Sequence, residues 1–296
     1  MKEYRYLIAS IICLGTVSMV GCSKNVGSIE ENTSASQPDI PKKILESFVE
    51  LSAINQGIIL DIGAGTGKLT TKISNMIPHK EILALEPSKF MRIAFMARLS
   101  EHKELQKKIT ILPINLEQYN FEDDISGVLC MGVLGHLTKE ERESLWETFE
   151  KKLKTGTPVL IGVLNKKFLS VPIGTPISIA QQDKNRYETF IKEINCNNKK
   201  KCEWVISYRI SYKNKVIREI TCPMNWNYES EEAVLKELSY ANFRCVKVSD
   251  TLLFARKNKK AKRVQEIGDL PKKKISHIIQ LEITNFCERK WYVGKK

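Results

Sequence analysis

The chain has 296 residues, 42% hydrophobic side chains and a formal net charge of +13, which suits a globular domain and excludes a mainly disordered protein. The charge by itself would suggest a nucleic-acid partner. However, residues 257–296 contain 12 Lys or Arg and four acidic residues, so this tail accounts for +8 of the surplus. A basic tail is typical of a solvated linker, and we expect no nucleic-acid partner.

The N-terminal 40 residues resemble a bacterial export signal followed by a tether. Residues 6–20 are apolar, too short for a comfortable membrane span and typical of a signal peptide. Residues 19–22, Met-Val-Gly-Cys, resemble a lipobox, which implies acylation at Cys22, and residues 23–40 are polar. Three alternatives stay open: uncleaved anchoring with the domain inside, a true start at Met19, or export.

Residues 57–67 read Gly-Ile-Ile-Leu-Asp-Ile-Gly-Ala-Gly-Thr-Gly. The apolar run predicts a strand buried on both faces, and the glycines predict a turn that lets the backbone approach a ligand. A helix should follow, because Leu69, Ile73, Met76 and Ile77 fall on one face. Together they form a nucleotide-binding corner. Asp61, just before the turn, would repel a pyrophosphate but suits a cationic ligand.

Four further strands are predicted in chain order. Residues 81–85 end at Glu86, where an acid can accept hydrogen bonds from both hydroxyls of a ribose. Residues 109–112 lead into Asn115, and residues 125–131 lead into His136. Thr138 and Glu141 predict a capping box for a helix whose inner face is Leu145, Trp146, Phe149 and Leu153. Residues 157–163 give the fifth strand.

This order of motifs resembles class I S-adenosylmethionine (SAM) methyltransferases, closely over residues 45–165 and in outline over 225–256. The resemblance implies an α/β, doubly wound, Rossmann-like domain over residues 41–256. Its seven-stranded sheet would be mostly parallel, with an antiparallel final strand and an inserted substrate-roofing region at 165–225. It also implies SAM as cofactor. Asn115 stands where the family often has Asp against the adenine. The implied cofactor contacts are Asp61, Gly63, Gly65, Gly67, Glu86, Asn115, Leu116 and Met131.

The inserted region is expected to carry the acceptor site. Tyr187 and Phe190 suggest a helix, whereas alternating apolar residues over 203–221 predict a hairpin that turns near 213–215. The candidate acceptor-site residues are Tyr187, Trp204, Tyr208 and Trp226, although packing against the core is the alternative for each. His136 is the candidate catalytic base, with a purely structural role as its alternative.

The rest of the chain completes the domain and adds a tail. Trp226 and Tyr228 precede a helix capped by Ser230, and residues 244–248 and 251–256 predict a closing antiparallel hairpin. Residues 278–287 resemble the opening strand of a radical SAM domain, but only Cys287 of the three cluster cysteines is present. We interpret residues 257–296 as a basic linker and a degenerate fusion partner; an ordinary amphipathic strand is the alternative.

Eight cysteines without a C-x-x-C pair give no disulfide framework, and no HExxH motif predicts a metal. Cys196 and Cys202 could bridge if the chain is exported, but a reduced, cytosolic chain fits equally well. We expect methyl transfer to a nucleophilic N or O of a small molecule, such as an amino sugar, an amine or another metabolite. The domain should lie in the cytoplasm, free or at the inner face of the membrane. The alternative is a non-catalytic, membrane-anchored lipoprotein that uses this fold as a binding module. The sequence does not indicate an oligomeric state.

Overall fold

The computed structural model describes residues 40–164, 170–197, 201–227 and 229–258. One compact unit ends at Lys257. The predictions for the export-like segment with Cys22, for Tyr228 and for the tail with Cys287 lie outside the described residues. Within the described part of the chain, no helix is both long and apolar enough to span a membrane. The same residues contain no cluster of three or more His, Cys, Asp or Glu side chains arranged to hold a metal.

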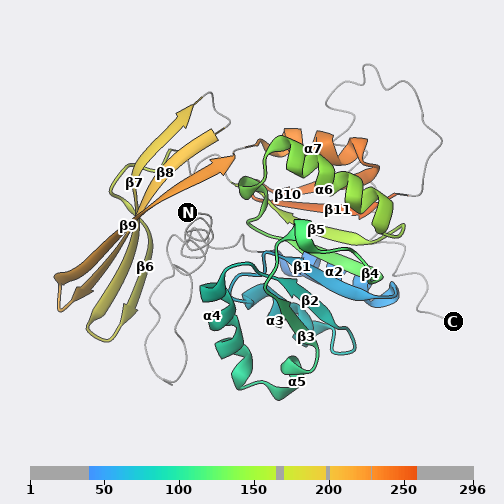
Figure 1. Ribbon diagram of the computed structural model, residues 1–296, viewed down its shortest axis with the longest axis horizontal. Helices are drawn as coiled ribbons and strands as arrows, with labels where there is room; N and C mark the ends of the chain where they lie inside the picture. Colours follow the sequence, from blue (N-terminus) through green and yellow to red (C-terminus); the bar gives the residue numbers. More distant parts are fainter. Residues whose placement is uncertain (1–39, 165–169, 198–200, 228, 259–296) are drawn as a thin grey trace. The chain divides into compact units, whose positions relative to one another are not determined.

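The main sheet has seven strands in the order β10-β11-β5-β4-β1-β2-β3 (Figure 1). Only β11 runs antiparallel, to both β5 and β10, so the predicted doubly wound fold is confirmed. Strands β2 to β5 each begin and end within one residue of their predicted bounds, because their buried apolar runs are sharply delimited. The bounds are β1 Ile58–Ile62, β2 Ile82–Leu85, β3 Ile109–Leu112, β4 Ile125–Cys130, β5 Pro158–Gly162, β10 Phe243–Ser249 and β11 Leu252–Lys257.

Helices cover both faces of this sheet, because successive strand residues point to opposite sides. Leu60 packs in a buried cluster with helices α6 (Lys139–Lys152) and α7 (Glu231–Tyr240). Ile59 packs in a second cluster with the helices of the other face. Those helices are α2 Lys42–Ile54, α3 Lys68–Met76, α4 Lys89–Ser100 and α5 Lys103–Gln106. Two short 3₁₀ turns, η1 (Leu116–Gln118) and η2 (Leu134–His136), follow β3 and β4.

Two helix starts are capped as predicted. The Thr138 hydroxyl accepts from the Glu141 amide at 3.2 Å, and the Glu141 carboxylate accepts from the Thr138 amide at 2.6 Å. Ser230 Oγ accepts from the amide of Ala233 at 3.2 Å. Each cap satisfies a backbone donor that a helix end leaves without an intrahelical partner, and so fixes where α6 and α7 begin.

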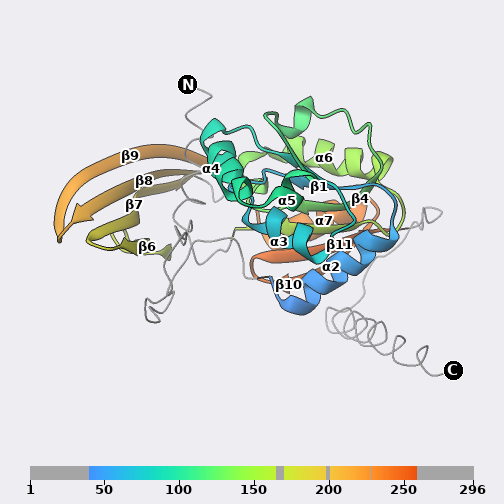
Figure 2. The same cartoon turned by 90° about the horizontal axis from the view of Figure 1, so that it is seen from below.

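A second, four-stranded antiparallel sheet forms the insertion, in the order β6-β7-β8-β9. Its long strands are visibly curved (Figure 2). The bounds are β6 Pro176–Gln182, β7 Asn185–Asn197, β8 Lys201–Tyr212 and β9 Lys215–Asn227. The predicted hairpin is confirmed, with its turn at Lys213 and Asn214, whose φ angles of 47° and 65° are left-handed.

The helix suggested around Tyr187 and Phe190 is wrong, because both residues lie on strand β7. Tyr187 pairs with Ala180 of β6 and with Ile210 of β8. The three-residue spacing of Tyr187 and Phe190 imitates a helix face. It arises here because β7 carries apolar side chains on both faces of the sheet, with Phe190 buried on one and Ile191 buried on the other.

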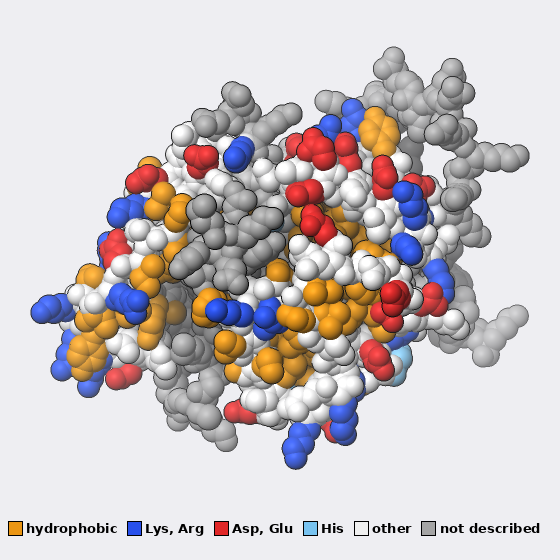
Figure 3. Space-filling model, in the orientation of Figure 1, with side chains coloured by type: hydrophobic (Ala, Val, Ile, Leu, Met, Phe, Trp, Pro, Cys, Tyr) orange, Lys and Arg blue, Asp and Glu red, His pale blue; other side chains and the backbone are white. Residues whose placement is uncertain are grey.

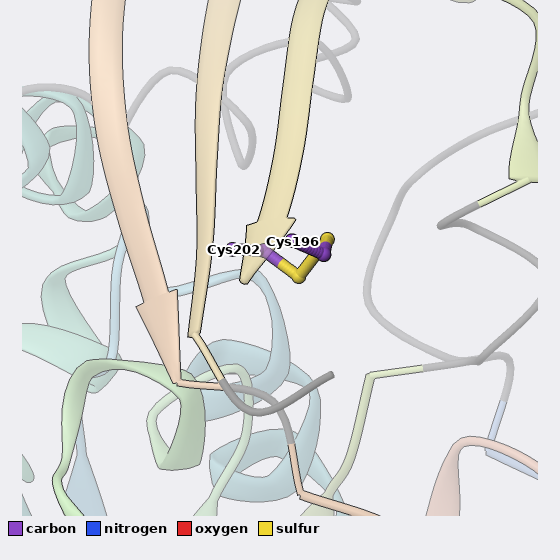
Figure 4. Close-up of a disulfide and its surroundings, with 2 residues drawn as sticks. All are labelled: Cys196 and Cys202. Carbon is purple, nitrogen blue, oxygen red and sulfur yellow. A yellow bond between two sulfur atoms is a disulfide. The ribbon is translucent and has the colours of Figure 1, made fainter. Parts of the chain in front are cut away.

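A disulfide joins Cys196 of β7 to Cys202 of β8, at the ends of the two strands (Figure 4). The two cysteines are directly opposite each other in the register of the strands. The sequence left open whether this pair is bridged, and the structure has the bond. Cys130, Cys222 and Cys245 are free cysteines within the described residues. A disulfide is more common in oxidising compartments than in the cytosol.

Candidate functional site

The site lies where the strand order of the main sheet reverses. β1 and β4 are neighbours, with β2 and β3 on one side and β5, β11 and β10 on the other. In open α/β sheets, ligands bind beyond the carboxyl ends of the strands at such a switch point. The segments that reach this edge here are residues 63–67 after β1, Glu86 after β2, and residues 131–137 after β4.

The three loop glycines have different tasks, although the sequence made them look alike. All three have left-handed φ angles, 66° at Gly63, 61° at Gly65 and 73° at Gly67. A Cβ at Gly67 would overlap the Phe95 ring of α4, and a Cβ at Gly63 would crowd Val133. A Cβ at Gly65 would meet no protein atom within 4 Å. Gly65 therefore borders open space, while Gly63 and Gly67 serve packing within the protein.

Glu86 is tied directly to that loop. Its carboxylate accepts the Gly65 amide through Oε2 and the Ser88 amide through Oε1, both at 2.8 Å. Burial raises the pKa of Glu86, and these two backbone hydrogen bonds and the Arg92 guanidinium oppose that rise. Each carboxylate oxygen has a second acceptor position, so Glu86 can hold the loop and still accept hydrogen bonds from a ligand.

Asp61 lies at the end of β1, close enough to Glu86 for their charges to interact. It is 3% exposed, and Thr70 donates its hydroxyl hydrogen to Oδ2 at 2.6 Å. Burial raises the pKa of Asp61 to about 7, the Thr70 hydrogen bond opposes this, and the nearby Glu86 adds to it. Two carboxyl groups beside one glycine turn favour a ligand that carries positive charge there.

The predicted adenine-side residues have structural roles that the sequence did not reveal. Asn115 caps η1: its Oδ1 accepts from the Gln118 amide at 3.1 Å, and Gln118 Oε1 accepts from the Asn115 amide at 3.0 Å. An acid would cap this turn equally well, so the departure from Asp conserves the local fold. Leu116 packs against the core cluster of α6 and α7, and Met131 is buried where β4 ends.

The candidate acceptor residues meet at η2 and at the end of β9. The His136 and Trp226 rings lie 4.8 Å apart between centroids in an edge-on arrangement. Trp226 also stacks with Trp204 of β8 at 6.4 Å. A Cβ at Gly135 would overlap the Trp226 indole, so glycine is required for this approach. Three predicted residues from separate parts of the chain, His136, Trp204 and Trp226, are thus brought together.

The two candidate tyrosines are placed differently from one another. Tyr208 is half-buried against the same apolar cluster as Trp204. Tyr187 pairs with Ile210, six positions along β8 from Trp204, which corresponds to about 20 Å at the rise of a strand. Of the two, therefore, only Tyr208 lies near the tryptophan pair.

The surroundings of His136 keep its imidazole uncharged. Burial among neighbouring protein atoms lowers the pKa of His136 to about 4, because it disfavours the charged imidazolium. The residue nevertheless keeps an exposed surface. At neutral pH the imidazole is uncharged, the form that can act as a base.

Three residues at or near the site were not identified from the sequence. Thr70 supports Asp61 and Ser88 supports Glu86, while Arg142 of α6, which is 2% exposed, donates to the carbonyl oxygen of Leu137 just after η2. Arg142 had a detectable signature, since it occupies the same helix face as Leu145, Trp146 and Phe149. A charged residue on an apolar face indicates a buried partner.

Residues 59–156 match the family model described as methyltransferase domain. This stretch begins on β1 and covers the glycine loop, Glu86 and η2. Domain match, strand order and loop geometry together define an enzyme of the methyltransferase class with SAM as its cofactor. No curated protein matches the sequence.

Solved structures with the same fold include several methyltransferases. The sugar N-methyltransferase KedS8 from a Streptoalloteichus species is 12% identical, with a TM-score of 0.58, over 81% of this chain and 98% of that one. CalS10, an amino pentose methyltransferase from Micromonospora echinaspora, is 11% identical, with a TM-score of 0.57, over 73% and 89%. A SAM-dependent methyltransferase from Clostridium acetobutylicum is 14% identical, with a TM-score of 0.55, over 75% and 94%.

The residues present fit this cofactor. SAM is a sulfonium cation with a ribose, and the glycine loop provides open space at Gly65 between two buried acids. The paired acids would disfavour a pyrophosphate at the same loop, because like charges repel. The two acids therefore favour SAM over the dinucleotides that bind at similar strand–turn–helix sites.

Proposed function

We propose that this protein transfers the methyl group of SAM to a nucleophilic nitrogen or oxygen of a small molecule. The observation that carries the proposal is the Glu86 carboxylate, buried and bound to the Gly65 amide. In this contact a carboxylate with unused acceptor positions, which would accept from ribose hydroxyls, lies against the one loop glycine that borders open space.

The protein's own part in the reaction is to bind, orient and exclude water. SAM supplies a methyl group on an already activated leaving group, so proximity and desolvation account for most of the remaining work. Asp61, Gly65 and Glu86 would hold the cofactor, with Asn115, Leu116 and Met131 at its adenine side. Gly63 acts through packing against Val133, and Gly67 through packing against Phe95 of α4.

The acceptor would bind on the side of η2 and β9. His136 would accept a proton at an imidazole nitrogen as the nucleophile attacks, and Trp226 would hold the histidine ring through their edge-on contact. Trp204 supports Trp226 from behind, and Tyr208 extends the same apolar face. We keep Tyr187 as a candidate only for a long acceptor, since it lies further along the second sheet.

The acceptor class proposed here is an amino sugar, an amine or a similar metabolite. Two proteins that share the fold, KedS8 and CalS10, are a sugar N-methyltransferase and an amino pentose methyltransferase. Their low identity makes this a guide for screening. Amino sugars, small amines and phenols are the first compounds to test with SAM and the full-length protein.

Calorimetric titration of SAM into the wild-type protein and into Glu86→Ala tests the proposal. Loss of a carboxylate that accepts two ligand hydrogen bonds costs about 2–3 kcal/mol, so the affinity should fall roughly 30- to 150-fold. Glu81→Ala is the matched control, because Glu81 is an exposed acid that immediately precedes the same strand. An absence of binding to the wild type, or equal affinities in Glu86→Ala and Glu81→Ala, would refute the proposal.

One observation favours the second candidate, an exported and membrane-anchored binding module. The Cys196–Cys202 disulfide is typical of an oxidising compartment, and the N-terminal segment resembles a lipoprotein signal. SAM is made in the cytosol, so we infer that a working enzyme stays in the cytoplasm, free or at the inner face of the membrane. Palmitate labelling of wild type and Cys22→Ala, with protease treatment of intact cells, separates these outcomes. A labelled, protease-accessible product would establish the exported module.

A further inference from the structure

Arg142 is a buried charge that methyl transfer itself does not require. It lies on α6, and 2% of its side chain is exposed. Removing a guanidinium from water is costly, so a buried arginine persists only with partners that compensate its charge. Its partners therefore indicate its task.

The guanidinium has three hydrogen-bond partners, which lie in separate segments of the chain. Glu237 of α7 accepts from Nε at 3.2 Å and from Nη2 at 2.9 Å, in a bidentate pair. Glu229, between β9 and α7, accepts from Nη2 at 3.0 Å. The carbonyl oxygen of Leu137 accepts from Nη1 at 3.4 Å. Figure 3 shows acidic side chains gathered where α6 and α7 begin.

Two of these partners flank the residues proposed for the acceptor site. Leu137 directly follows His136, and Glu229 follows Trp226 by three residues. The His136 and Trp226 rings make contact although they lie 90 residues apart in the sequence. Their contact requires that the segment after β4 and the segment after β9 keep a fixed spacing. Arg142 is bonded to both segments.

We propose that Arg142 is a positioning residue of the acceptor site, and that its guanidinium holds the His136 segment and the Trp226 segment against each other. A brace between α6 and α7 alone would need only Glu237. The contacts to Leu137 and Glu229 extend the network to the site. This inference rests on the proposed function for its meaning, but its test does not require SAM or an acceptor.

The planar fork of arginine suits this task better than a lysine. Arginine has five N–H donors in a fixed geometry, whereas the lysine ammonium is a compact point charge. An ammonium at this position could pair with Glu237 or Glu229 but could not reach all three segments at once. Arg142→Lys therefore keeps the charge and removes the connection.

The contact between His136 and Trp226 can be measured directly by NMR in the full-length protein. With ¹³C-labelled histidine, the ring current of Trp226 shifts the His136 Cε1–H resonance, and His136→Gln assigns that signal. Trp226→Leu gives the resonance position without the contact. In Arg142→Lys and in Glu229→Ala, we expect the resonance to move at least half of the way toward the Trp226→Leu position.

A matched control separates positioning from general support. Trp146 donates Nε1–H to the same Glu237 carboxylate at 2.9 Å. This hydrogen bond does not involve Leu137 or Glu229. Trp146→Phe should lower the melting temperature and leave the His136 resonance at its wild-type position. If Arg142→Lys fails to fold, Glu229→Ala still decides, since Glu229 is partly exposed, at 23%, and its loss costs less.

An unmoved His136 resonance in folded Glu229→Ala would overturn the proposal, and so would an equal shift in Trp146→Phe. Calorimetry with SAM on the same variants keeps the two proposals apart. We expect Glu229→Ala to bind SAM with wild-type affinity, because Asp61, Gly65 and Glu86 are untouched. If the wild type does not bind SAM while the resonance shifts as expected, the proposed function fails and the positioning role of Arg142 stands.

Discussion

The two halves of the candidate site are built in different ways. Most of the cofactor half is made by backbone groups and two acids within residues 58–88, where the Gly65 and Ser88 amides hold Glu86. The acceptor half is made by side chains from distant segments, with His136 after β4 and Trp226 at the end of β9. The first half is determined by a short stretch of sequence and the second by tertiary packing.

This difference predicts that the cofactor half is specific for one ligand class while the acceptor half can vary. A loop that presents backbone amides and needs glycine at a left-handed φ tolerates few substitutions. Aromatic side chains on a separate antiparallel sheet can be exchanged without disturbing that loop. A fold can therefore keep one cofactor and change its acceptor through the second sheet.

Substitution of Gly65 should have the largest effect, and it tests the cofactor half. In Gly65→Val the branched side chain would occupy the open space beside the loop and strain a φ of 61°. SAM affinity measured by calorimetry should fall beyond roughly 1,000-fold, which corresponds to about 4 kcal/mol.

Gly174→Val is the control for backbone strain. Gly174 has a φ of 83° and, like Gly65, no atom within 4 Å of an added Cβ, but it precedes β6 and is far from the loop in sequence. Both variants should lose comparable stability, and only Gly65→Val should lose SAM binding. Retained SAM affinity in Gly65→Val would mean that the ligand does not approach this glycine.

His136 gives the next largest effect and tests the acceptor half. Removal of a general base typically lowers turnover about 100-fold, so His136→Ala should do so while SAM affinity stays near the wild-type value. The assay uses whichever screened amine, amino sugar or phenol is methylated. His79→Ala, at an exposed position after α3, is the control. A decrease of less than about threefold would show that positioning alone suffices.

Asp61 should give the smallest effect, a pH dependence. Its pKa of about 7 means that the carboxyl is mostly neutral at pH 6 and mostly ionised at pH 8. A bound cation favours the ionised form, so SAM affinity should rise about tenfold from pH 6 to pH 8. The same shift makes the free protein less stable as the pH rises from about 4 to about 7, because the folded state holds the proton more tightly than the unfolded chain.

The variant Asp61→Asn isolates this group, because the amide is neutral throughout and can still accept from Thr70. It should show nearly the same SAM affinity at pH 6 and pH 8, close to that of the wild type at pH 6. Thermal unfolding of the free variant at pH 8 should occur at a higher temperature than in the wild type. An unchanged pH dependence in Asp61→Asn would assign the titration to another group.

Much of the main sheet could be predicted because its information is local. Apolar runs bounded by glycine and polar residues fixed β1 to β5, and the caps at Thr138 and Ser230 fixed α6 and α7. The helix suggested at Tyr187 failed because β7 carries apolar residues on both faces, which hides the two-residue period.

The part of the candidate site that depends on the glycine turn and on the acids after the strands could be predicted from the sequence. The positions of Gly65 and Glu86 followed from the motif, whereas the separate task of Gly67 depends on Phe95, 28 residues further along. The meeting of His136 with Trp226, and the network of Arg142, depend on contacts between distant segments. Residue types and spacing do not encode such contacts.

The Cys196–Cys202 bond also has a topological consequence. Together with the five residues between the cysteines it closes a small covalent ring. The ring lowers the conformational entropy of the unfolded chain and so stabilises the folded state by about 2 kcal/mol. Lys199, Lys200 and Lys201 lie within that ring. A trypsin-like protease that cuts there would open the ring without releasing either part, so the nicked chain would keep its full mass until a reductant is added.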